Sequence, residues 1–365
     1  MSKAEENPLC SRISALDLFC GAGGLTNGLI KAGIGVEAGI DIDEQSAYAF
    51  RTNNPGVEFL CWDVARKKSP SIAKQFRPGA IRLLAGCAPC QPFSKLTNGS
   101  GDHRAWDLLD NFGRFVRRIQ PELVTMENVP ELAGRGNEVF QRFLKTLQSC
   151  GYWTDWRVVR CEDYGVPQAR KRLVLLASRF GEIHVPEGHC RQPSQWRTVR
   201  KAISGLPPIT HGEQDPDDPL HVAVRLTPMN MKRIRATPLN GGTWKSWPKK
   251  LLLPCHTRST GRKYGSIYGR MWWDKPGPTM TTLCTGLGNG RFGHPDQDRA
   301  ISLREASLLQ SFPRHYKFWP EGQKVNRKAV ARMIGNAVPP ALAEALGRAL
   351  VAHTLKAYDA RGARA

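Results

Sequence analysis

A cysteine stands between two prolines shortly after a short apolar run. The run, residues 81–85, predicts a buried strand, and Gly86 ends it in a turn that leads to Cys90. A cysteine in this place stands at the carboxyl end of a strand, where open α/β sheets bind their ligands. Because Pro89 and Pro92 stiffen the backbone on both sides of Cys90, its sulfur can be held in a fixed attack geometry.

Three kinds of chemistry fit this segment. A free thiol is most often a buried structural group. Cys87 and Cys90 also form a C-x-x-C pair, which fits a redox couple or half of a zinc site. The sequence has no other C-x-x-C and no H-x-x-x-H, and the Ser/Gly-rich stretch after Pro92 disfavours the long helix that a redox pair usually opens. An activated nucleophile is the third interpretation, and it requires partners elsewhere in the chain.

Candidate partners follow two later strands. Residues 123–126 predict a strand that ends in Glu127, which would neighbour Cys90 across a parallel sheet. Arg170 and Arg172 are two residues apart, so they share one face of an extended segment. Two guanidinium groups on one face can clamp an anion or a polarised carbonyl, although a solvated basic stretch is the alternative.

The start of the chain has the pattern of a nucleotide-binding unit. Residues 12–19 predict a strand, Gly21-Ala-Gly-Gly24 a tight turn, and the apolar spacing after Leu25 a helix. Thr26 holds the third glycine position of the dinucleotide fingerprint. This disfavours a nicotinamide or flavin cofactor and fits one that has adenosine but no pyrophosphate.

Acids end the next two predicted strands. Asp41 follows the strand 35–40 at the distance from the glycine turn that suits ribose hydroxyls, although a solvated strand-end acid is the alternative. Ile42 could cover an adenine face. Asp63 ends the predicted strand 59–64 and is a candidate for the adenine amino group.

The predicted elements divide the chain in two. Strands and helices alternate to about residue 180, and Pro, Gly, Trp and basic residues then become frequent through residue 275. This composition predicts a small irregular domain whose basic groups bind phosphates and whose planar groups stack on bases. Residues 207–219 predict an exposed linker. Ser302 and Glu305 predict a capped helix start, and a final helix over 341–357 returns to the first domain.

The bulk composition agrees with a nucleic-acid partner. The 365 residues carry a net charge of +21 with a pI near 9.9, a field that attracts polyanions, although a solubility surface is the alternative. We find no signal peptide and no apolar run long enough to cross a membrane. Ten scattered cysteines predict reduced thiols in a cytosolic compartment.

Six stretches, in this order, resemble the DNA (cytosine-5) methyltransferase family of the bacterial modification-methylase type. They are Asp17-Leu-Phe-Cys-Gly-Ala-Gly-Gly24, Ala88-Pro-Cys-Gln-Pro-Phe-Ser94, Glu127-Asn-Val129, Gln168-Ala-Arg-Lys-Arg172, Arg304-Glu-Ala-Ser-Leu-Leu-Gln-Ser-Phe-Pro313 and Gly335-Asn-Ala-Val338. The resemblance implies an S-adenosyl-L-methionine-dependent enzyme in which Cys90 adds to carbon 6 of a flipped-out cytosine. By the same resemblance Glu127 binds ring nitrogen 3 and the exocyclic amine, and Arg172, supported by Arg170, binds the ring carbonyl.

The resemblance also assigns the binding residues. The cofactor would contact Phe19, Gly21, Gly23, Leu25, Asp41, Ile42, Asp63, Asn336 and Val338. DNA would contact Gln91, Ser94 and Arg104, and the segment 94–107 would close behind the flipped base. The resemblance implies no metal. The family often has Glu-Trp where this chain has Asp41-Ile42.

We therefore expect an α/β fold, a seven-stranded Rossmann-like methyltransferase sheet with a small, mostly irregular or β target recognition domain. Residues 1–180 and 325–365 would form the catalytic and cofactor-binding domain, and 181–324 the recognition domain and hinge. The expected reaction methylates carbon 5 of cytosine in a specific double-stranded DNA sequence, in the cytoplasm at the bacterial nucleoid, with a possible separate restriction endonuclease as partner. Methylation of transfer RNA, a catalytically silent DNA-binding relative and a nicotinamide oxidoreductase are the alternatives.

Overall fold

The computed structural model describes residues 12–89, 104–134, 137–258 and 265–362, without the side chains of 104–107 and 360–362. The chain forms two compact units. Unit 1 comprises residues 1–160, 171–188 and 338–365, and unit 2 comprises 161–170 and 189–337. Unit 2 thus takes a short segment, 161–170, from before residue 181, and its main part begins at residue 189 and includes the helix α11 (Arg327–Asn336). The roles expected for the two domains remain predictions.

Unit 1 is built on one seven-stranded sheet, as predicted. Its order is β3-β2-β1-β4-β5-β7-β6, and the first five strands along it are parallel while β7 runs antiparallel to both of its neighbours. The strands are β1 (Ile13–Leu18), β2 (Gly35–Asp41), β3 (Glu58–Cys61), β4 (Ile81–Gly86), β5 (Leu123–Asn128), β6 (Trp153–Arg160) and β7 (Lys171–Ser178). The strands β1 and β5 are buried along their whole length, as expected for the centre of a sheet that is covered on both faces.

The third strand ends earlier than predicted. We expected it to continue to Asp63, but β3 ends at Cys61. The backbone N–H of Trp62 donates to the carbonyls of Leu60 and Asp41, and that of Ala65 donates to the carboxyl of Asp63. The chain therefore turns at the point where periodicity alone predicted two more strand residues.

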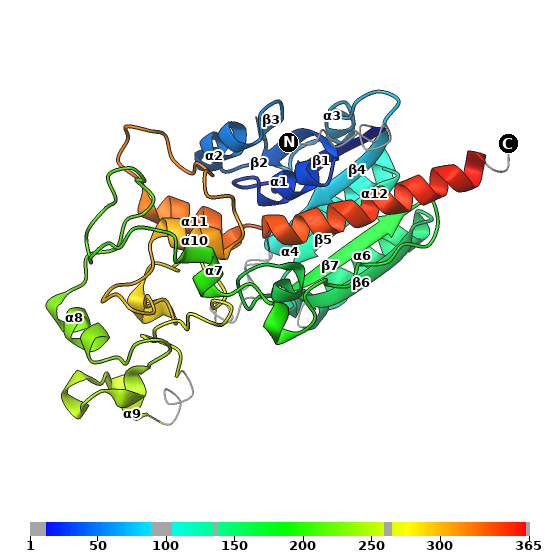
Figure 1. Cartoon of the computed structure of the whole chain (residues 1–365). Helices are drawn as coiled ribbons and strands as arrows, with labels where there is room; N and C mark the ends of the chain where they lie inside the picture. Colours follow the sequence, from blue (N-terminus) through cyan, green and yellow to red (C-terminus); the bar gives the residue numbers. More distant parts are fainter. Residues whose placement is uncertain (1–11, 90–103, 135–136, 259–264, 363–365) are drawn as a thin grey trace. The chain divides into compact units, whose positions relative to one another are not determined.

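Helices cover both faces of the sheet (Figure 1). On one face, α3 (Ser69–Ala73), α4 (Arg104–Ile119) and α6 (Asn137–Ser149) enclose the largest apolar cluster, which includes Phe112, Phe115, Phe140 and Phe143. On the other face, α1 (Gly24–Lys31) packs along α12 (Pro340–Gly362). The short helices α2 (Ala47–Asn53) and α5 (Glu131–Gly134) complete the described part of this unit.

Unit 2 is held together by helices, isolated bridges and buried polar groups. Its α-helices in the described residues are α7 (Val199–Ile203), α8 (Pro228–Arg235), α9 (Pro254–Thr257), α10 (Leu303–Leu309) and α11. Its β component in these residues is limited to isolated bridges. Arg270, 1% exposed, donates to the carbonyls of Ile234, Thr237 and His294. An irregular backbone leaves carbonyl groups unpaired inside the protein, and this guanidinium satisfies several of them.

Two predictions within unit 2 had different outcomes. The helix start at Ser302 is confirmed, because its Oγ accepts from the N–H of Glu305 and the Glu305 carboxylate accepts from the N–H of Ser302. The prediction of an exposed linker over 207–219 is confirmed for exposure and wrong for the linker, because most of these residues are exposed but the segment lies within unit 2. Asp215 is buried and caps a turn, and Asp218 forms an ion pair with Arg304. These carboxylates have internal partners, which composition alone does not reveal.

Candidate active site

A buried acid lies where β5 meets its two neighbours. Glu127 is 3% exposed near the carboxyl end of β5. Arg172, near the start of the antiparallel strand β7, places its Nε 2.9 Å from Oε1 of Glu127. From the turn after β4, the thiol of Cys87 donates to Oε2 of Glu127 at 2.9 Å. The acid is therefore held between groups that come from both adjacent strands.

The turn that carries Cys87 is fixed on two sides. The N–H of Cys87 donates to the carbonyl of Leu18 at the end of β1, at 3.3 Å. The side-chain amide of Asn128 donates to the carbonyl of Ala88, at 3.2 Å. A Cβ at Gly86 would lie 2.9 Å from the Leu18 carbonyl oxygen, so this close approach requires glycine. The start of the segment that leads to Cys90 is thus tied to β1 and to β5.

Several predicted residues lie outside what the structure describes. These are the expected nucleophile Cys90 and two of the expected DNA contacts, Gln91 and Ser94. Arg104 begins α4, and its side chain is not among the described ones. Their roles remain predictions.

Arg170 has partners of its own, apart from Arg172. It is 2% exposed and belongs to unit 2. Its guanidinium donates to the carbonyls of Met280, at 2.9 Å, and Gly335, at 3.1 Å. Gln168 joins the same network, because its side-chain oxygen accepts from the N–H of Met280 at 2.7 Å. The described contacts of Arg170 are therefore structural links within unit 2.

The glycine turn and the end of β2 meet at a second acid. Phe19, Gly21 and Gly23 have φ angles of 61°, 50° and 88°, which place this turn in the left-handed region. The carboxyl of Asp41 accepts from the N–H of Gly21 and from that of Asp43, both at 2.8 Å. Burial raises the pKa of Asp41, and these backbone donors oppose the shift.

The other residues predicted to bind the cofactor differ in their exposure, their contacts and the unit to which they belong. Ile42 is 67% exposed, which is unusual for isoleucine, directly after β2. Asp63 follows β3, and its carboxylate lies 3.2 Å from Nε of Arg66. Leu25 and Val338 are buried. Asn336 is exposed at the end of α11 in unit 2, whereas Val338 belongs to unit 1.

No partner could be predicted from the sequence for two residues near the carboxyl edge of the sheet, Cys87 and Asp17. Cys87 attracted notice only as half of a C-x-x-C, and Asp17 only as part of a motif. Asp17 is fully buried, and Oδ2 accepts from the hydroxyl and the N–H of Thr26, at 2.7 and 3.1 Å. Burial raises the pKa of Asp17 to about 7. Thr26, the residue that breaks the dinucleotide fingerprint, was the available signal for this partner.

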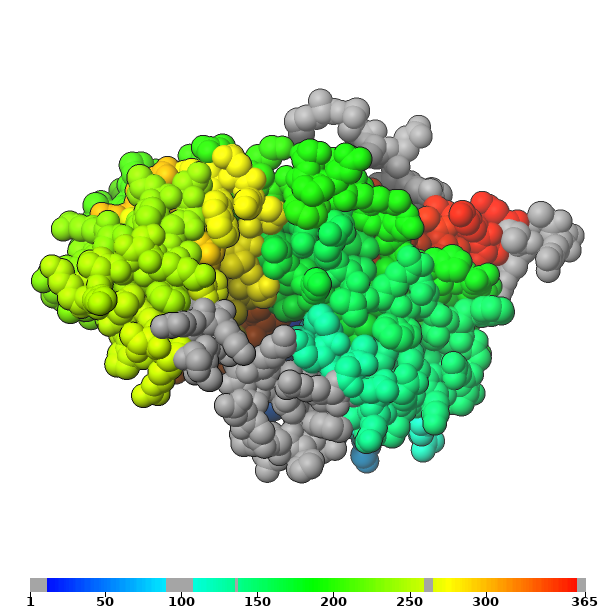
Figure 2. Space-filling view, turned by 90° about the horizontal axis from the view of Figure 1, so that it is seen from below, coloured from blue at the N-terminus to red at the C-terminus, as the bar shows by residue number. Residues whose placement is uncertain are grey.

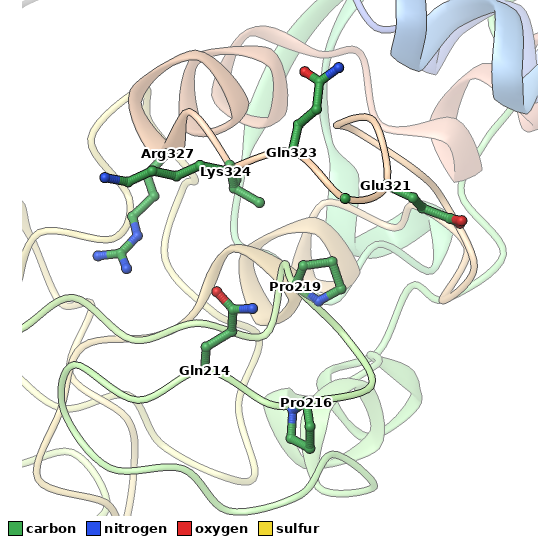
Figure 3. Close-up of a pocket in the computed structure, with 9 residues that line it drawn as sticks. Gln214, Pro216, Pro219, Glu321, Gln323, Lys324 and Arg327 are labelled. Carbon is green, nitrogen blue, oxygen red and sulfur yellow. The ribbon is translucent and has the colours of Figure 1, made fainter.

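One hollow that the structure describes is separate from these residues. It measures about 860 Å³, lies within unit 2 and is open to solvent (Figure 3). Lys324, Arg327, Gln323 and Gln214 are among its lining residues, and none of the predicted site residues is. The described residues also contain no group of three or more metal-ligating side chains, and no helix among them is long and apolar enough to span a membrane.

Residues 13–352 match the model of the C-5 cytosine-specific DNA methylase family. The chain belongs to this family. It is 47% identical over 340 residues to the type II methylase M.HgiDII of Herpetosiphon aurantiacus, a match that covers 92% of this chain and 94% of the relative. It is 28% identical to the type II methyltransferase M1.HphI of Haemophilus parahaemolyticus, over 94% of this chain and 87% of that one.

A solved structure shares the fold. It is an E. coli protein, encoded within a prophage and described as a DNA modification methyltransferase, with a TM-score of 0.69 and 22% identity over 93% of this chain and 98% of its own. At this identity the likeness concerns the fold alone. The predicted family and the predicted enzyme class, a DNA cytosine-5 methyltransferase, are confirmed by the family match and by the type II methylase relative.

Proposed function

We propose that this C-5 cytosine methylase transfers a methyl group from S-adenosyl-L-methionine to a flipped-out cytosine in a specific double-stranded DNA sequence. The observation that supports this most strongly is the position of Glu127. Its carboxyl lies between Cys87 and Arg172 at the carboxyl edge of the sheet. Cys87 precedes Cys90 by three residues in the sequence. This edge is where open α/β sheets bind ligands.

In the proposed reaction the thiolate of Cys90 adds to carbon 6 of cytosine. The addition makes carbon 5 nucleophilic and builds negative charge on the ring. Glu127, in its protonated form, would donate to ring nitrogen 3 and accept from the exocyclic amine, which selects cytosine over thymine. Arg172 would bond the ring carbonyl oxygen and stabilise the developing charge, and Arg170 would support it through the backbone it organises. A base then removes the carbon 5 proton as the Cys90 sulfur leaves.

The residues at the ends of β1, β2 and β3 fit S-adenosyl-L-methionine. Asp41 offers a carboxylate beside a glycine turn, and Ile42 next to it presents an exposed apolar face that suits adenine. When bound, this cofactor supplies the methyl group and leaves as S-adenosyl-L-homocysteine. Further residues that would hold it are Phe19, Gly21, Gly23, Leu25, Asp63, Asn336 and Val338. The proposed division of labour gives most of the cofactor contacts and of the chemistry to unit 1, and unit 2 would contribute Asn336 and Arg170.

Unit 2 would recognise the DNA. It carries 26 Lys and Arg residues against 11 Asp and Glu, and so most of the net charge of the chain. The segment 228–258, from α8 to the residue after α9 and yellow-green in Figure 2, has six exposed basic residues: Lys232, Arg235, Lys245, Lys249, Lys250 and Arg258. Gln91, Ser94 and Arg104 would add contacts around the flipped base. Phosphate contacts from such groups give affinity, and contacts to base edges give specificity.

Methyl transfer to defined substrates tests the proposal. The protein is incubated with S-adenosyl-L-methionine labelled in the methyl group and with either mixed-sequence duplex DNA or transfer RNA. We expect label in DNA, and none with Cys90→Ser; label in transfer RNA alone would refute the DNA substrate. Duplex DNA with 5-fluorocytosine at the target should trap a covalent adduct, and an adduct that persists in Cys90→Ser would refute the nucleophile.

The target sequence and the partner need a cellular experiment. Bisulfite sequencing of a bacterial host that expresses the protein identifies the methylated sites. We propose that the enzyme acts on DNA at the nucleoid, in the cytoplasm, and protects its site from a separate cognate endonuclease. Methylation scattered over unrelated sequences would contradict a single specific target.

A further inference from the structure

We propose that the thiol of Cys87 is a positioning group for Glu127 and holds the carboxyl in the orientation that receives the cytosine edge. This proposal rests on the proposed function for its catalytic consequence. Its structural part, a hydrogen bond from Cys87 to Glu127, can be tested without any methyl transfer.

The first argument is the geometry of the contact. The Sγ of Cys87 lies 2.9 Å from Oε2 of Glu127, and the acid is 3% exposed. Arg172 lies against the other oxygen, Oε1. The hydrogen bond from Cys87 therefore fixes Oε2, whereas Oε1 has the charge of Arg172 beside it and no hydrogen bond from a described residue.

The second argument is that the thiol itself has a fixed position. The backbone of Cys87 is bonded to Leu18, and the next residue, Ala88, is bonded to Asn128. A thiol on a mobile loop would not constrain an acid, whereas this one is attached to two central strands. Asn128 also follows Glu127 directly in β5, so the donor and the acceptor are held by one local network.

The third argument is that the contact leaves room for a substrate. A carboxyl oxygen accepts more than one hydrogen bond, and a thiol is a weak donor. Cys87 can therefore orient Oε2 without occupying all its acceptor capacity, and the exocyclic amine of cytosine can bond to the same carboxyl. A stronger or larger group at position 87 would restrict the acid more tightly.

Kinetics of three variants test the catalytic part. Cys87→Ala should lower kcat about tenfold, because the loss of one hydrogen bond to a charged group has an effect of about this size. The KM for the cofactor, the KM for DNA and the Tm should stay nearly unchanged. Cys87→Ser keeps a donor and should retain most of the activity. In a Glu127→Gln background, Cys87→Ala should have a smaller effect, because the two residues act through one contact. Full activity of Cys87→Ala, or equal effects in both backgrounds, would overturn the positioning role.

Site-resolved alkylation tests the contact itself. The reactive form of a thiol is the thiolate, and a carboxylate at hydrogen-bond distance disfavours it. With iodoacetamide, Cys87 should react several-fold faster in Glu127→Gln than in the unchanged protein, while the exposed Cys255 reacts equally in both. Mass spectrometry of the peptide distinguishes Cys87 from Cys90. An unchanged Cys87 rate would overturn the inferred contact even if the enzyme methylates DNA. A faster rate would support the contact even if methyl transfer were absent. Alkylation therefore distinguishes failure of the inferred contact from failure of the proposed function.

Discussion

Two buried carboxyl groups at the edge of the sheet are held in different ways. Glu127 is flanked by Cys87 and Arg172, which come from other strands. Asp17 is bonded through one oxygen to Thr26, and its other oxygen, Oδ1, has no hydrogen-bond partner in the described part of the chain. Glu127 has a cation, Arg172, beside it, whereas the surroundings of Asp17 make its ionised form costly.

The environment of Asp17 predicts a pH-dependent stability. Its pKa is about 7 in the folded protein, against an ordinary value of 3.8. Between these values the unfolded chain has lost a proton that the folded chain keeps, so the free energy of unfolding falls as the pH rises. One such group contributes about 1.4 kcal/mol per pH unit in this window and nothing further above it.

Urea unfolding at pH 4 to 8 measures this effect, with Asp17→Asn as the comparison. The amide cannot ionise and can still accept from Thr26. We expect the stability of Asp17→Asn relative to the unchanged protein to increase from pH 4 to pH 7 and then to remain constant. A constant difference over the whole range would show that Asp17 does not titrate there.

The contribution of Arg172 to catalysis should depend on the planar shape of its side chain as well as on its charge. Its side chain lies against Glu127 through Nε, and a lysine keeps the charge but not the planar fork. We expect Arg172→Ala to lower kcat by about 10²- to 10³-fold, the usual effect of removing one oxyanion-type donor, and Arg172→Lys to recover only part of it. The exposed Arg179, directly after the other end of β7, is the matched control. Equal losses for Arg172→Ala and Arg179→Ala would contradict the proposed role.

At the scale of elements, the crossing of α1 and α12 depends on small residues. A Cβ at Gly28 would lie 2.4 Å from the Cβ of Ala343 and 2.5 Å from the carbonyl oxygen of Pro340. A Cβ at Gly347 would lie 2.6 Å from the Cβ of Ala32. The first and last helices of unit 1 therefore approach closely at both ends of their contact, and α1 also follows the glycine turn.

Gly28→Ala should therefore destabilise the protein by about 1–3 kcal/mol, the usual range for overpacking, although alanine favours helices. The control is Gly134→Ala, because a Cβ at Gly134 has no atom within 4 Å. Thermal unfolding compares the two variants. A lower Tm for Gly134→Ala than for Gly28→Ala would contradict the close packing of α1 on α12.

Most strands of unit 1 could be predicted from the sequence because they are short apolar runs between turn residues, whereas β6 is partly polar and largely exposed. Glu127 and Arg172 were found in the same way, as polar residues next to such runs. Cys87 and Asp17 were not given partners, because the Cys87–Glu127 contact joins residues 40 positions apart and no spacing rule predicts it. Apart from the helix start at Ser302, unit 2 was predicted only as mostly irregular or β. Its buried charges, such as Arg299 with Glu305, depend on the folded backbone and leave no periodic signal.

At the scale of the whole molecule, the charge is unevenly divided. Unit 2 has 26 basic and 11 acidic residues, and unit 1 has 27 and 21. Exposed basic residues gather between α8 and α9, whereas the buried ones, Arg270, Arg299 and Arg304, are engaged in internal contacts. The segment 228–258 has no acidic residue, so the charge of its exposed basic residues is not offset within the segment.

This distribution predicts a salt-dependent affinity for DNA that depends on where the charge lies. If about six phosphates are contacted, the affinity for duplex DNA should fall about a thousandfold between 50 and 200 mM salt. Replacing Lys249 and Lys250 by glutamine should lower the slope of log K against log[salt] by up to about two, because each lost phosphate contact removes nearly one unit. The same replacement of Lys68 and Lys74, which are exposed in unit 1, changes the net charge equally and should leave the slope nearly unchanged. Equal changes from both pairs, measured by fluorescence anisotropy, would show that DNA responds to the total charge and not to the basic segment of unit 2.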